Sequence, residues 1–210
     1  VSAIVDIEET QVRALRRKLR VLLAQALMPA AWVLRLGAER LKPLWCFARL
    51  NEALAGRVHS TAVVLGPVTL EGTRHIDIGR HARIYPGVYL ETQGAGRIIL
   101  GDNVVLSSGV HIVAFDHVSI GDGAMLGEYT SVRDANHRLC SSAMRDSGFD
   151  VAPVRIERNV WIGRGVTVLK GVTIGSNSVI GANAVVTRSV PEDARAVGVP
   201  AITRPLARTQ

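Results

Sequence analysis

A six-residue repeat between Ile156 and Val186 constrains the fold of this chain more than any other feature of its sequence. Steps of six residues along this stretch all land on aliphatic residues that branch at Cβ. These anchors are Ile156, Ile162, Val168, Ile174, Ile180 and Val186. A helix repeats every 3.6 residues and a strand every two, so a period of six indicates a repeat architecture.

The repeat predicts a parallel β-helix in which each unit supplies a short strand and a turn. The anchor points into a narrow prism, and three units close one triangular coil whose open edge the next coil covers. The residue three positions after each anchor falls in a turn, where Asn and Gly best tolerate positive φ. These turn residues are Asn159, Gly165, Gly171, Asn177, Asn183 and Ser189. We therefore expect an all-β solenoid, and its thin core suits the low aromatic content of 4%.

This stretch resembles the left-handed hexapeptide-repeat acyltransferases, and among them the sugar acetyltransferases of the maltose and galactoside type. The motifs that carry the resemblance are Val160-Trp161-Ile162-Gly163, Gly171-Val172-Thr173-Ile174-Gly175, Val179-Ile180-Gly181-Ala182-Asn183-Ala184-Val185-Val186-Thr187 and Gly198-Val199-Pro200-Ala201. The resemblance covers about residues 58–205. It implies the left-handed sense of the coil, which the period does not show. It also implies a homotrimer with each active site between two prisms.

Earlier anchors extend the solenoid toward the N-terminus, with short insertions after some coils. They are Val58, Val64, Leu70, Ile78, Ile84, Leu90, Leu100, Leu106, Ile112, Ile120, Leu126 and Val132. Together with the six later anchors they predict six coils of three units. We expect the left-handed parallel β-helix to occupy residues 57–190 and residues 191–210 to form a short C-terminal cap.

Residues 1–56 have a different composition and predict an N-terminal helical segment. Apolar and basic residues recur there at helical spacing, namely Val12, Leu15, Leu19, Leu22, Leu23 and Leu27 among Arg13, Arg16, Arg17, Lys18 and Arg20. Pro29 predicts a kink or a restart of the helix, and Gly37 and Pro43 predict further breaks. The apolar run over residues 21–36 is too short to span a membrane. Acidic residues before the basic ones do not fit a signal peptide.

Two interpretations of this segment stay open. It packs as a helical cap on the first coil or on a neighbouring subunit, or its basic helix is an interfacial anchor on an anionic membrane. The net charge of +7 is compatible with a membrane surface or a phosphate-rich cofactor. Basic residues are not interleaved with aromatic ones, so we expect no nucleic-acid partner. Cys46 and Cys140 are too few for a disulfide framework, which predicts a cytoplasmic protein, peripheral at the inner face of the membrane under the second interpretation.

The longest interruption of the repeat predicts a loop extruded over residues 133–153, and such excursions often carry function. We single out His137 in this loop as the catalytic residue, because a histidine can take up and release a proton near neutral pH. In the family a catalytic histidine opens a loop that runs through Arg-x-Ser-Gly and Pro into Trp-Ile-Gly. The matching residues follow His137 in the same order: Arg145-Asp146-Ser147-Gly148, Pro153 and Trp161-Ile162-Gly163. Arg138 replaces the proline that usually follows the histidine.

The resemblance implies direct transfer of an acetyl group from acetyl-coenzyme A to a sugar hydroxyl. We expect His137 to take the proton of the acceptor and backbone amides near Gly163 and Arg164 to hold the oxyanion. Asp134 is a candidate to orient the imidazole. Matched residue by residue, Arg164, Ala182, Thr187 and Arg188 fall on cofactor-contacting positions of the family. The resemblance adds Trp161 and Gly163 from the Trp-Ile-Gly motif, and Arg204, which stands slightly out of register after Gly-Val-Pro.

The acceptor positions match the family less well. Candidate acceptor contacts are Asp116, Asp134 and Asn136. Asp116 lies one residue from an acceptor-binding Asp of the family, and Ser107 stands where an Asn is expected. The acceptor is therefore expected to differ from a simple maltose or galactoside, and surface polysaccharide assembly is one setting for it.

Three alternative functions predict different features in the sequence. N-acetylation of a nucleotide-linked amino sugar is the nearest alternative. A zinc carbonic anhydrase on the same fold would use His81, His111 and His117, but their spacing does not match the closely spaced pair of that family, and we expect no metal. A non-catalytic solenoid would show regular Thr or Ser ladders, and the sequence has none.

Overall fold

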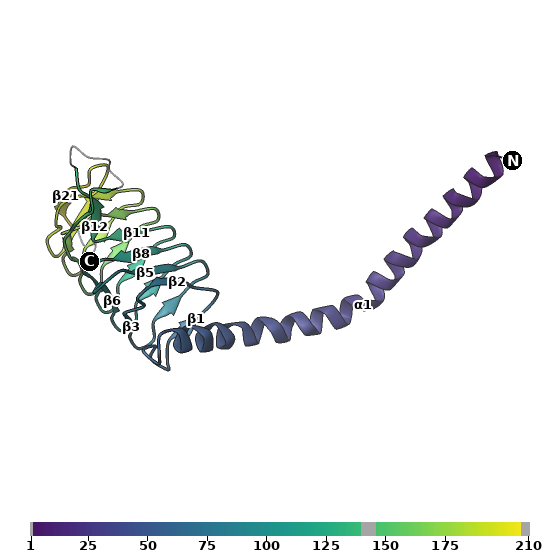
Figure 1. Ribbon diagram of the computed structural model, residues 1–210, viewed down its shortest axis with the longest axis horizontal. Helices are drawn as coiled ribbons and strands as arrows, with labels where there is room; N and C mark the ends of the chain where they lie inside the picture. Colours follow the sequence, from purple (N-terminus) through teal and green to yellow (C-terminus); the bar gives the residue numbers. More distant parts are fainter. Residues whose placement is uncertain (1, 140–145, 207–210) are drawn as a thin grey trace. The chain divides into compact units, whose positions relative to one another are not determined.

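The computed structural model describes residues 2–139 and 146–206, which form one long helix and a β-solenoid (Figure 1). Contacts divide the chain into two units, Val1–Lys42 and Pro43–Gln210. The helix, α1, runs from Ser2 to Ala53. It neither restarts at Pro29 nor ends at Gly37 or Pro43, so the expected restart and the two later breaks are wrong. A proline inside a helix removes one backbone donor, and the rest of the hydrogen-bond ladder continues on either side.

The last turns of α1 belong to the solenoid unit. Leu50 and Leu54 are buried in its core, and Cys46 and Phe47 pack against the same core. This end of the helix therefore closes the first coil. In the described part of the chain, no helix is both long and apolar enough to cross a membrane.

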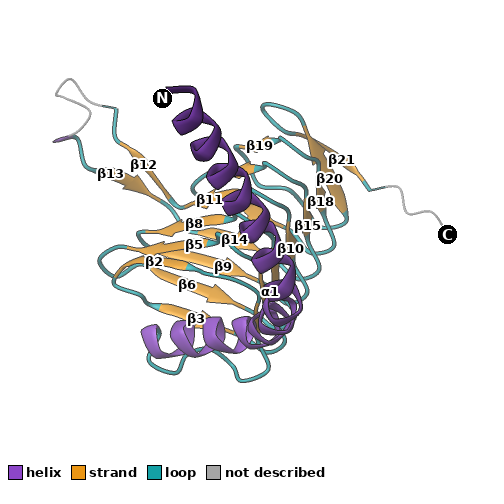
Figure 2. Cartoon of the chain, turned by 90° about the vertical axis from the view of Figure 1, so that its right-hand side faces the viewer, coloured by secondary structure: helices purple, strands orange, loops and turns teal. Residues whose placement is uncertain are grey.

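Three parallel sheets form the faces of the solenoid (Figure 2). The first face consists of β1 (Val63–Val64), β4 (Arg83–Ile84), β7 (Val105–Leu106), β10 (Met125–Leu126), β15 (Trp161–Ile162), β18 (Val179–Ile180), β20 (Ala194–Val197) and β21 (Ile202–Pro205). The second face consists of β2 (Thr69–Gly72), β5 (Tyr89–Thr92), β8 (His111–Ala114), β11 (Ser131–Arg133), β16 (Thr167–Val168) and β19 (Val185–Val186). The third face consists of β3 (Ile76–Ile78), β6 (Arg97–Leu100), β9 (His117–Ile120), β14 (Val154–Ile156) and β17 (Thr173–Ile174).

The predicted anchors stack on one another from coil to coil. Ile84 pairs with Val64 on one side and Leu106 on the other, and the other two faces continue in the same register. All eighteen predicted anchors except Leu70 are buried. The six-residue frame is therefore confirmed across every insertion. Burying each such side chain stabilises the coil by roughly 1.5–3 kcal/mol. A register that exposed these anchors would therefore be much less stable.

The predicted positive φ angles are confirmed at five of the six turn residues. Asn159, Gly165, Gly171, Asn177 and Asn183 have φ values of 55°, 68°, 75°, 59° and 59°. Ser189 is the exception, and Asp193, three residues after the buried Val190, takes a φ of 53° in the turn that stacks on Asn177, after the third face. The Ser189 hydroxyl instead accepts a hydrogen bond from the Thr173 N–H, at 3.0 Å, as the chain leaves the repeat.

The turns between the faces form three columns, which we call the first, second and third corners after the face that each follows. The first corner contains residues 127–129, 163–165 and 181–183. The second contains residues 169–171 and 187–189, and the third contains residues 101–103 and 121–123. An antiparallel hairpin of β12 (Ala135–His137) and β13 (Phe149–Val151) projects from the second corner (Figure 2). Beyond the last coil, β20 extends the first face and β21 pairs antiparallel with it.

Candidate active site

His137 ends strand β12, on the hairpin that leaves the second corner. Its side chain is exposed, and its ring lies 4.6 Å from the ring of Phe149 on β13, centroid to centroid. Phe149 in turn lies 4.5 Å from Phe115, in the turn after β8. This row of three rings sets His137 against the coil that carries Asp116. Of the predicted acceptor residues, the half-buried Asn136 precedes His137 on β12, and Asp116, which follows Phe115, is exposed.

Asp134 has a different role from the predicted one. Its side chain is fully buried, and its carboxylate accepts hydrogen bonds from three backbone amides. Oδ1 accepts from Phe115 at 2.8 Å, and Oδ2 accepts from Asp116 at 2.7 Å and from His117 at 2.9 Å. Both oxygens are therefore occupied away from solvent, and the prediction that Asp134 contacts the acceptor or orients the imidazole is wrong. It fixes the turn on which Phe115 and Asp116 stand.

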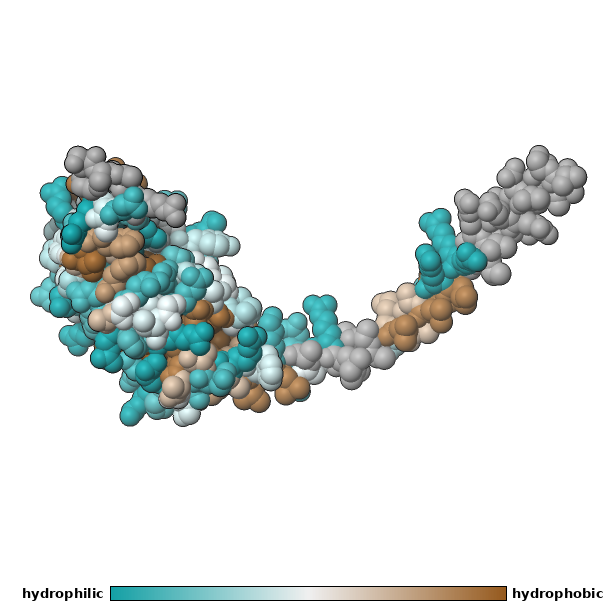
Figure 3. Space-filling model, in the orientation of Figure 1, coloured by the Kyte–Doolittle hydropathy of each residue, from teal (hydrophilic) through white to brown (hydrophobic). Residues whose placement is uncertain are grey.

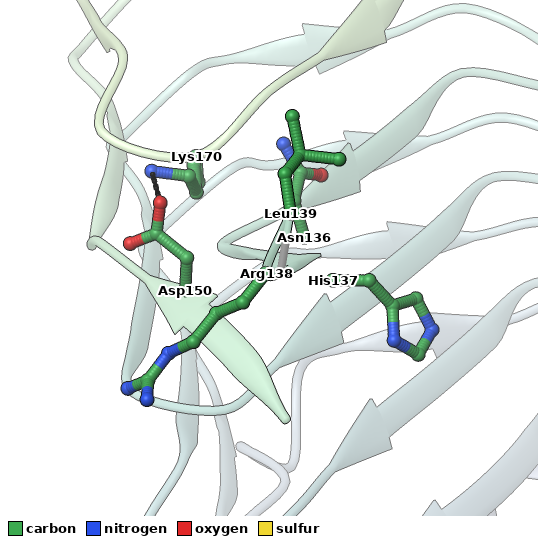
Figure 4. A pocket seen from close by; sticks show the side chains of 6 residues that line it. All are labelled: Asn136, His137, Arg138, Leu139, Asp150 and Lys170. Carbon is green, nitrogen blue, oxygen red and sulfur yellow. Dashed lines mark ion pairs between the residues drawn. The ribbon is translucent and has the colours of Figure 1, made fainter. Parts of the chain in front are cut away.

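An open groove of about 660 Å³ lies beside this hairpin. Its lining residues are Asn136, His137, Arg138, Leu139, Asp150 and Lys170. Lys170 Nζ lies 2.8 Å from Asp150 Oδ2 and ties the hairpin to the next coil. Figure 4 shows the His137 imidazole pointing to the opposite side from this ion pair. Within the described residues, no carboxylate or carbonyl hydrogen-bonds the imidazole, whose ring contact is Phe149.

The first corner presents open backbone donors. Gly163 donates its N–H to Ile180 O at 2.8 Å, so it cannot hold an oxyanion as predicted. The next amides along each coil, those of Arg164 and Ala182, make no hydrogen bond among the described residues. They belong to adjacent coils, which are about 4.8 Å apart in a parallel sheet. Two open N–H groups at this spacing can bind the oxygen atoms of an extended ligand.

Gly163 is needed for this stacking. A Cβ on Gly163 would lie 2.7 Å from the nitrogen of Ala182 and 3.0 Å from its Cα. Close packing of the coils at Gly163 thus sets the position of the Ala182 amide, and the cofactor contact of Gly163 stays a prediction.

Trp161 lies on the outer side of the first face and is 55% exposed. In register beyond it stand Val179, Arg195 and Arg204, the last on β21. Trp161 and Arg204 therefore share one surface with two rungs between them. Arg195, which the sequence analysis did not single out, adds a second cation there.

Tyr129 is a site residue that sequence reasoning missed. It has a φ of 59°, which is rare for an aromatic residue. The Arg164 guanidinium lies 5.5 Å from the centre of its ring. Gly109, on the coil before, leaves space for the Tyr129 ring, since a Cβ at residue 109 would lie 2.5 Å from that ring. A Tyr at the position that elsewhere carries Asn or Gly was the available signal.

A second missed cluster lies on the outer side of the second face, between the two corners. The rings of Tyr89 and His111 stack at 4.3 Å with a tilt of 9°. The Tyr89 hydroxyl donates to Glu91 Oε2 at 2.9 Å. Burial, followed by hydrogen bonds to Glu71 and Glu91, raises the pKa of Tyr89. Burial, followed by the charge of Arg133, lowers the pKa of His111.

The predicted site residues thus fall into two groups. Trp161, Gly163, Arg164, Ala182 and Arg204 lie on the first face or the first corner. His137, Asp116, Asn136, Thr187 and Arg188 lie at the second corner or on its hairpin. On one coil, Arg164 lies at the first corner and Lys170 at the second. The six residues from one to the other span at most roughly 20 Å of extended chain. One prism does not bring the two groups together.

Comparison with known proteins gives the same architecture. The family model described as bacterial transferase hexapeptide (six repeats) matches residues 153–188. The chain is 31% identical to a solved hexapeptide-repeat acetyltransferase, VCA0836 from Vibrio cholerae, in complex with acetyl-coenzyme A. That match has a TM-score of 0.57 and covers 62% of this chain and 71% of the other. This chain belongs to the hexapeptide-repeat acyltransferases. The predicted left-handed parallel β-helix is therefore confirmed as its fold.

Two curated relatives of this hexapeptide-repeat acyltransferase are matched over part of their length. A probable acetyltransferase, Rv3034c of Mycobacterium tuberculosis, is 37% identical over 108 residues, which is 50% of this chain and 36% of the relative. Nodulation protein L of Rhizobium meliloti is 40% identical over 108 residues, which is 51% of this chain and 58% of the relative. The chain thus spans about a third of the first relative and somewhat over half of the second.

The hexapeptide-repeat acyltransferase described here offers an imidazole at one corner and open amides at another. An exposed imidazole can accept a proton from a hydroxyl or an amine, and paired N–H donors can stabilise a developing oxyanion. Among the described residues, no three His, Cys, Asp or Glu side chains are grouped so as to hold a metal ion.

Proposed function

We propose that this protein is an acetyl-coenzyme-A-dependent O-acetyltransferase that acts on a hydroxyl group of a sugar or saccharide. The observation that carries the proposal is the exposed imidazole of His137, whose ring contacts Phe149, which in turn contacts Phe115, the residue before Asp116. The acetyltransferase relatives and the acetyl-coenzyme A complex of the Vibrio protein support the acyl donor.

In the proposed reaction, His137 takes the proton of the acceptor hydroxyl as its oxygen attacks the thioester carbonyl. The Arg164 amide donates a hydrogen bond to the oxyanion of the tetrahedral intermediate. The C–S bond then breaks, and the proton passes from His137 to the departing thiolate. General-base assistance of this kind is worth about 100- to 10,000-fold in rate.

The separation of the two groups of residues supports a site shared between two copies of the chain. The coenzyme would lie along the first corner and Trp161 of one copy. The second copy would supply His137, Thr187 and Arg188 from its second corner. A homotrimer allows three such contacts to close in a ring, because each copy presents a different corner to each neighbour.

Asp116 and Asn136 are the proposed acceptor contacts. A carboxylate and an amide suit hydroxyl groups, since both can accept hydrogen bonds from a sugar. Because the same groups also suit a protonated amine, N-acetylation of a nucleotide-linked amino sugar is the alternative that the acceptor test must separate.

The first experiment measures thiol release from acetyl-coenzyme A with saccharides, amino sugars and nucleotide-linked amino sugars as acceptors. We expect turnover with a hydroxyl acceptor, and we expect His137→Ala to lower kcat about 100- to 10,000-fold with unchanged thermal unfolding. His75→Ala, a histidine at the second corner of the first coil, is the matched control. Near-native turnover of His137→Ala would remove His137 from the mechanism, and turnover with amines alone would favour the alternative.

The second experiment tests the shared site. Two inactive variants, His137→Ala and Ala182→Tyr, are mixed after unfolding and refolded together. If the site spans two copies, some contacts pair an intact His137 with an intact first corner, and activity returns. If activity stays at the level of the separate variants in a mixed oligomer, each site lies within one chain.

A further inference from the structure

The excess of basic over acidic residues in this chain lies in one part of α1. Residues 12–42 contain eight Lys and Arg residues and one acidic residue, Glu39. The remaining residues contain seventeen basic and seventeen acidic residues, so they are neutral together. The entire net charge of +7 therefore belongs to a single helical stretch, outside the solenoid unit.

The same stretch exposes large apolar side chains. Leu19, Leu22 and Leu23 are 54%, 61% and 53% exposed, and Leu27 and Met28 are exposed as well. Figure 3 shows these hydrophobic residues next to the hydrophilic ones on this part of the helix. An exposed row of leucines is costly in water and indicates an interaction surface.

The apolar and basic residues are centred on neighbouring sides of the helix. Leu22 and Leu23 lie three and four residues after Leu19, which keeps all three on one side of the helix at 100° per residue. Arg17 and Arg20 fall about 100° or more around the helix from Leu19 and Leu22, and Arg16 lies at the border between the two sides, about 60° from Leu19. A helix with one leucine side and one arginine side can lie in the plane of an interface.

The charge pattern distinguishes between partners. From residue 10 to residue 38 the chain has no Asp or Glu, so a second copy of the helix would set arginines against arginines without a counter-charge. A nucleic acid would neutralise the arginines and leave the leucines in water. An anionic bilayer satisfies both, because its headgroups attract Arg and its acyl region takes the leucines.

We propose that residues 16–28 of α1 dock on the surface of an anionic membrane, with the leucine side in the bilayer and the arginines at the phosphate level. The helix lies on this surface and does not cross it, in keeping with its charge and hydropathy. The docking is independent of the proposed catalytic reaction, since none of these residues is in the site.

The test is co-sedimentation of the full chain with vesicles of phosphatidylcholine mixed with phosphatidylglycerol, compared with pure phosphatidylcholine. We expect binding to the mixed vesicles alone, weakened by added salt. Replacing Arg16, Arg17 and Arg20 together by Gln should weaken binding on the order of 100-fold. Replacing Leu19, Leu22 and Leu23 together by Ala should weaken it about tenfold or more while preserving the helix.

The matched control removes the same charge from the solenoid. Arg83, Arg155 and Arg158 are exposed there, and their replacement by Gln should leave binding within about twofold if the helix is responsible. The proposal is overturned if the unaltered chain does not bind the mixed vesicles at low salt. It is also overturned if the solenoid control loses as much binding as the arginine variant. Leucine-dependent self-association without lipid binding would assign the surface to a second copy instead.

Discussion

The backbone N–H of the second turn residue is hydrogen-bonded to a carboxylate at the third corner of the prism and is open at the first corner. At the third corner the amides of Arg80 and Asp102 donate to Asp102 Oδ1 and Asp122 Oδ1, at 2.7 and 2.8 Å. Each carboxylate therefore caps the turn of the coil before it. At the first corner the corresponding amides of Arg164 and Ala182 have no side-chain acceptor within the described chain.

This difference separates structure from function along one solenoid. A capped amide contributes to stability and has no capacity left for a ligand, while an open amide can bind one. The second corner follows the capped pattern through Asp134, and then projects the hairpin that carries His137. The chain thus exposes its donors at one corner and its base at another.

The largest expected effect is the loss of the buried carboxylate at the second corner. Asp134→Ala should lower the free energy of unfolding by at least about 3 kcal/mol, because three buried amides lose a charged acceptor. Urea unfolding measures the change. Asp116→Ala is the control, with an exposed side chain and an expected change within about 0.5 kcal/mol. Equal stability of the two variants would show that the second corner does not depend on its carboxylate.

The next effect tests the first corner, where the backbones of adjacent coils pack closely and, among the described residues, no carboxylate caps the turn. Gly163→Ala places a Cβ against the Ala182 nitrogen, and the crowding should cost about 1–3 kcal/mol in unfolding free energy. Gly37→Ala in α1 is the matched control, since no atom lies within 4 Å of its added Cβ. That change should raise helix content measured by circular dichroism. Comparable thermal unfolding of both variants would contradict the close packing at Gly163.

A smaller effect tests whether the open corner is organised for a ligand. Tyr129→Asn keeps a residue that tolerates positive φ and removes the ring beside Arg164. We expect coenzyme A to bind about two- to fivefold more weakly, with little change in unfolding. Calorimetric titration measures the affinity. Gly109→Ala, which displaces the same ring, should act in the same direction, and unchanged affinity in both variants would rule out a role for the stack.

The smallest effect concerns the face between the two corners. Because burial lowers the pKa of His111, the unfolded chain binds the proton more readily than the folded chain below about pH 6.5. Stability should therefore decrease as the pH falls below that value, and His111→Gln should lessen this decrease. Thermal unfolding between neutral and acidic pH measures it, with Tyr89→Phe as a control that keeps the imidazole. An identical pH dependence in His111→Gln would assign the acid sensitivity to other groups.

The sequence alone determined the six-residue frame, the anchors and five turn positions, because a fixed period places one apolar side chain of every unit inside the prism. Only the tertiary structure decided what lies across coils. Asp134 is buried because the hairpin folds its carboxylate beneath the turn at residues 115–117, and Tyr129 meets Arg164 one coil away. The candidate site divides between two corners for the same reason. Such contacts join residues far apart in the chain, and their geometry depends on loop paths and stacking that periodicity does not encode.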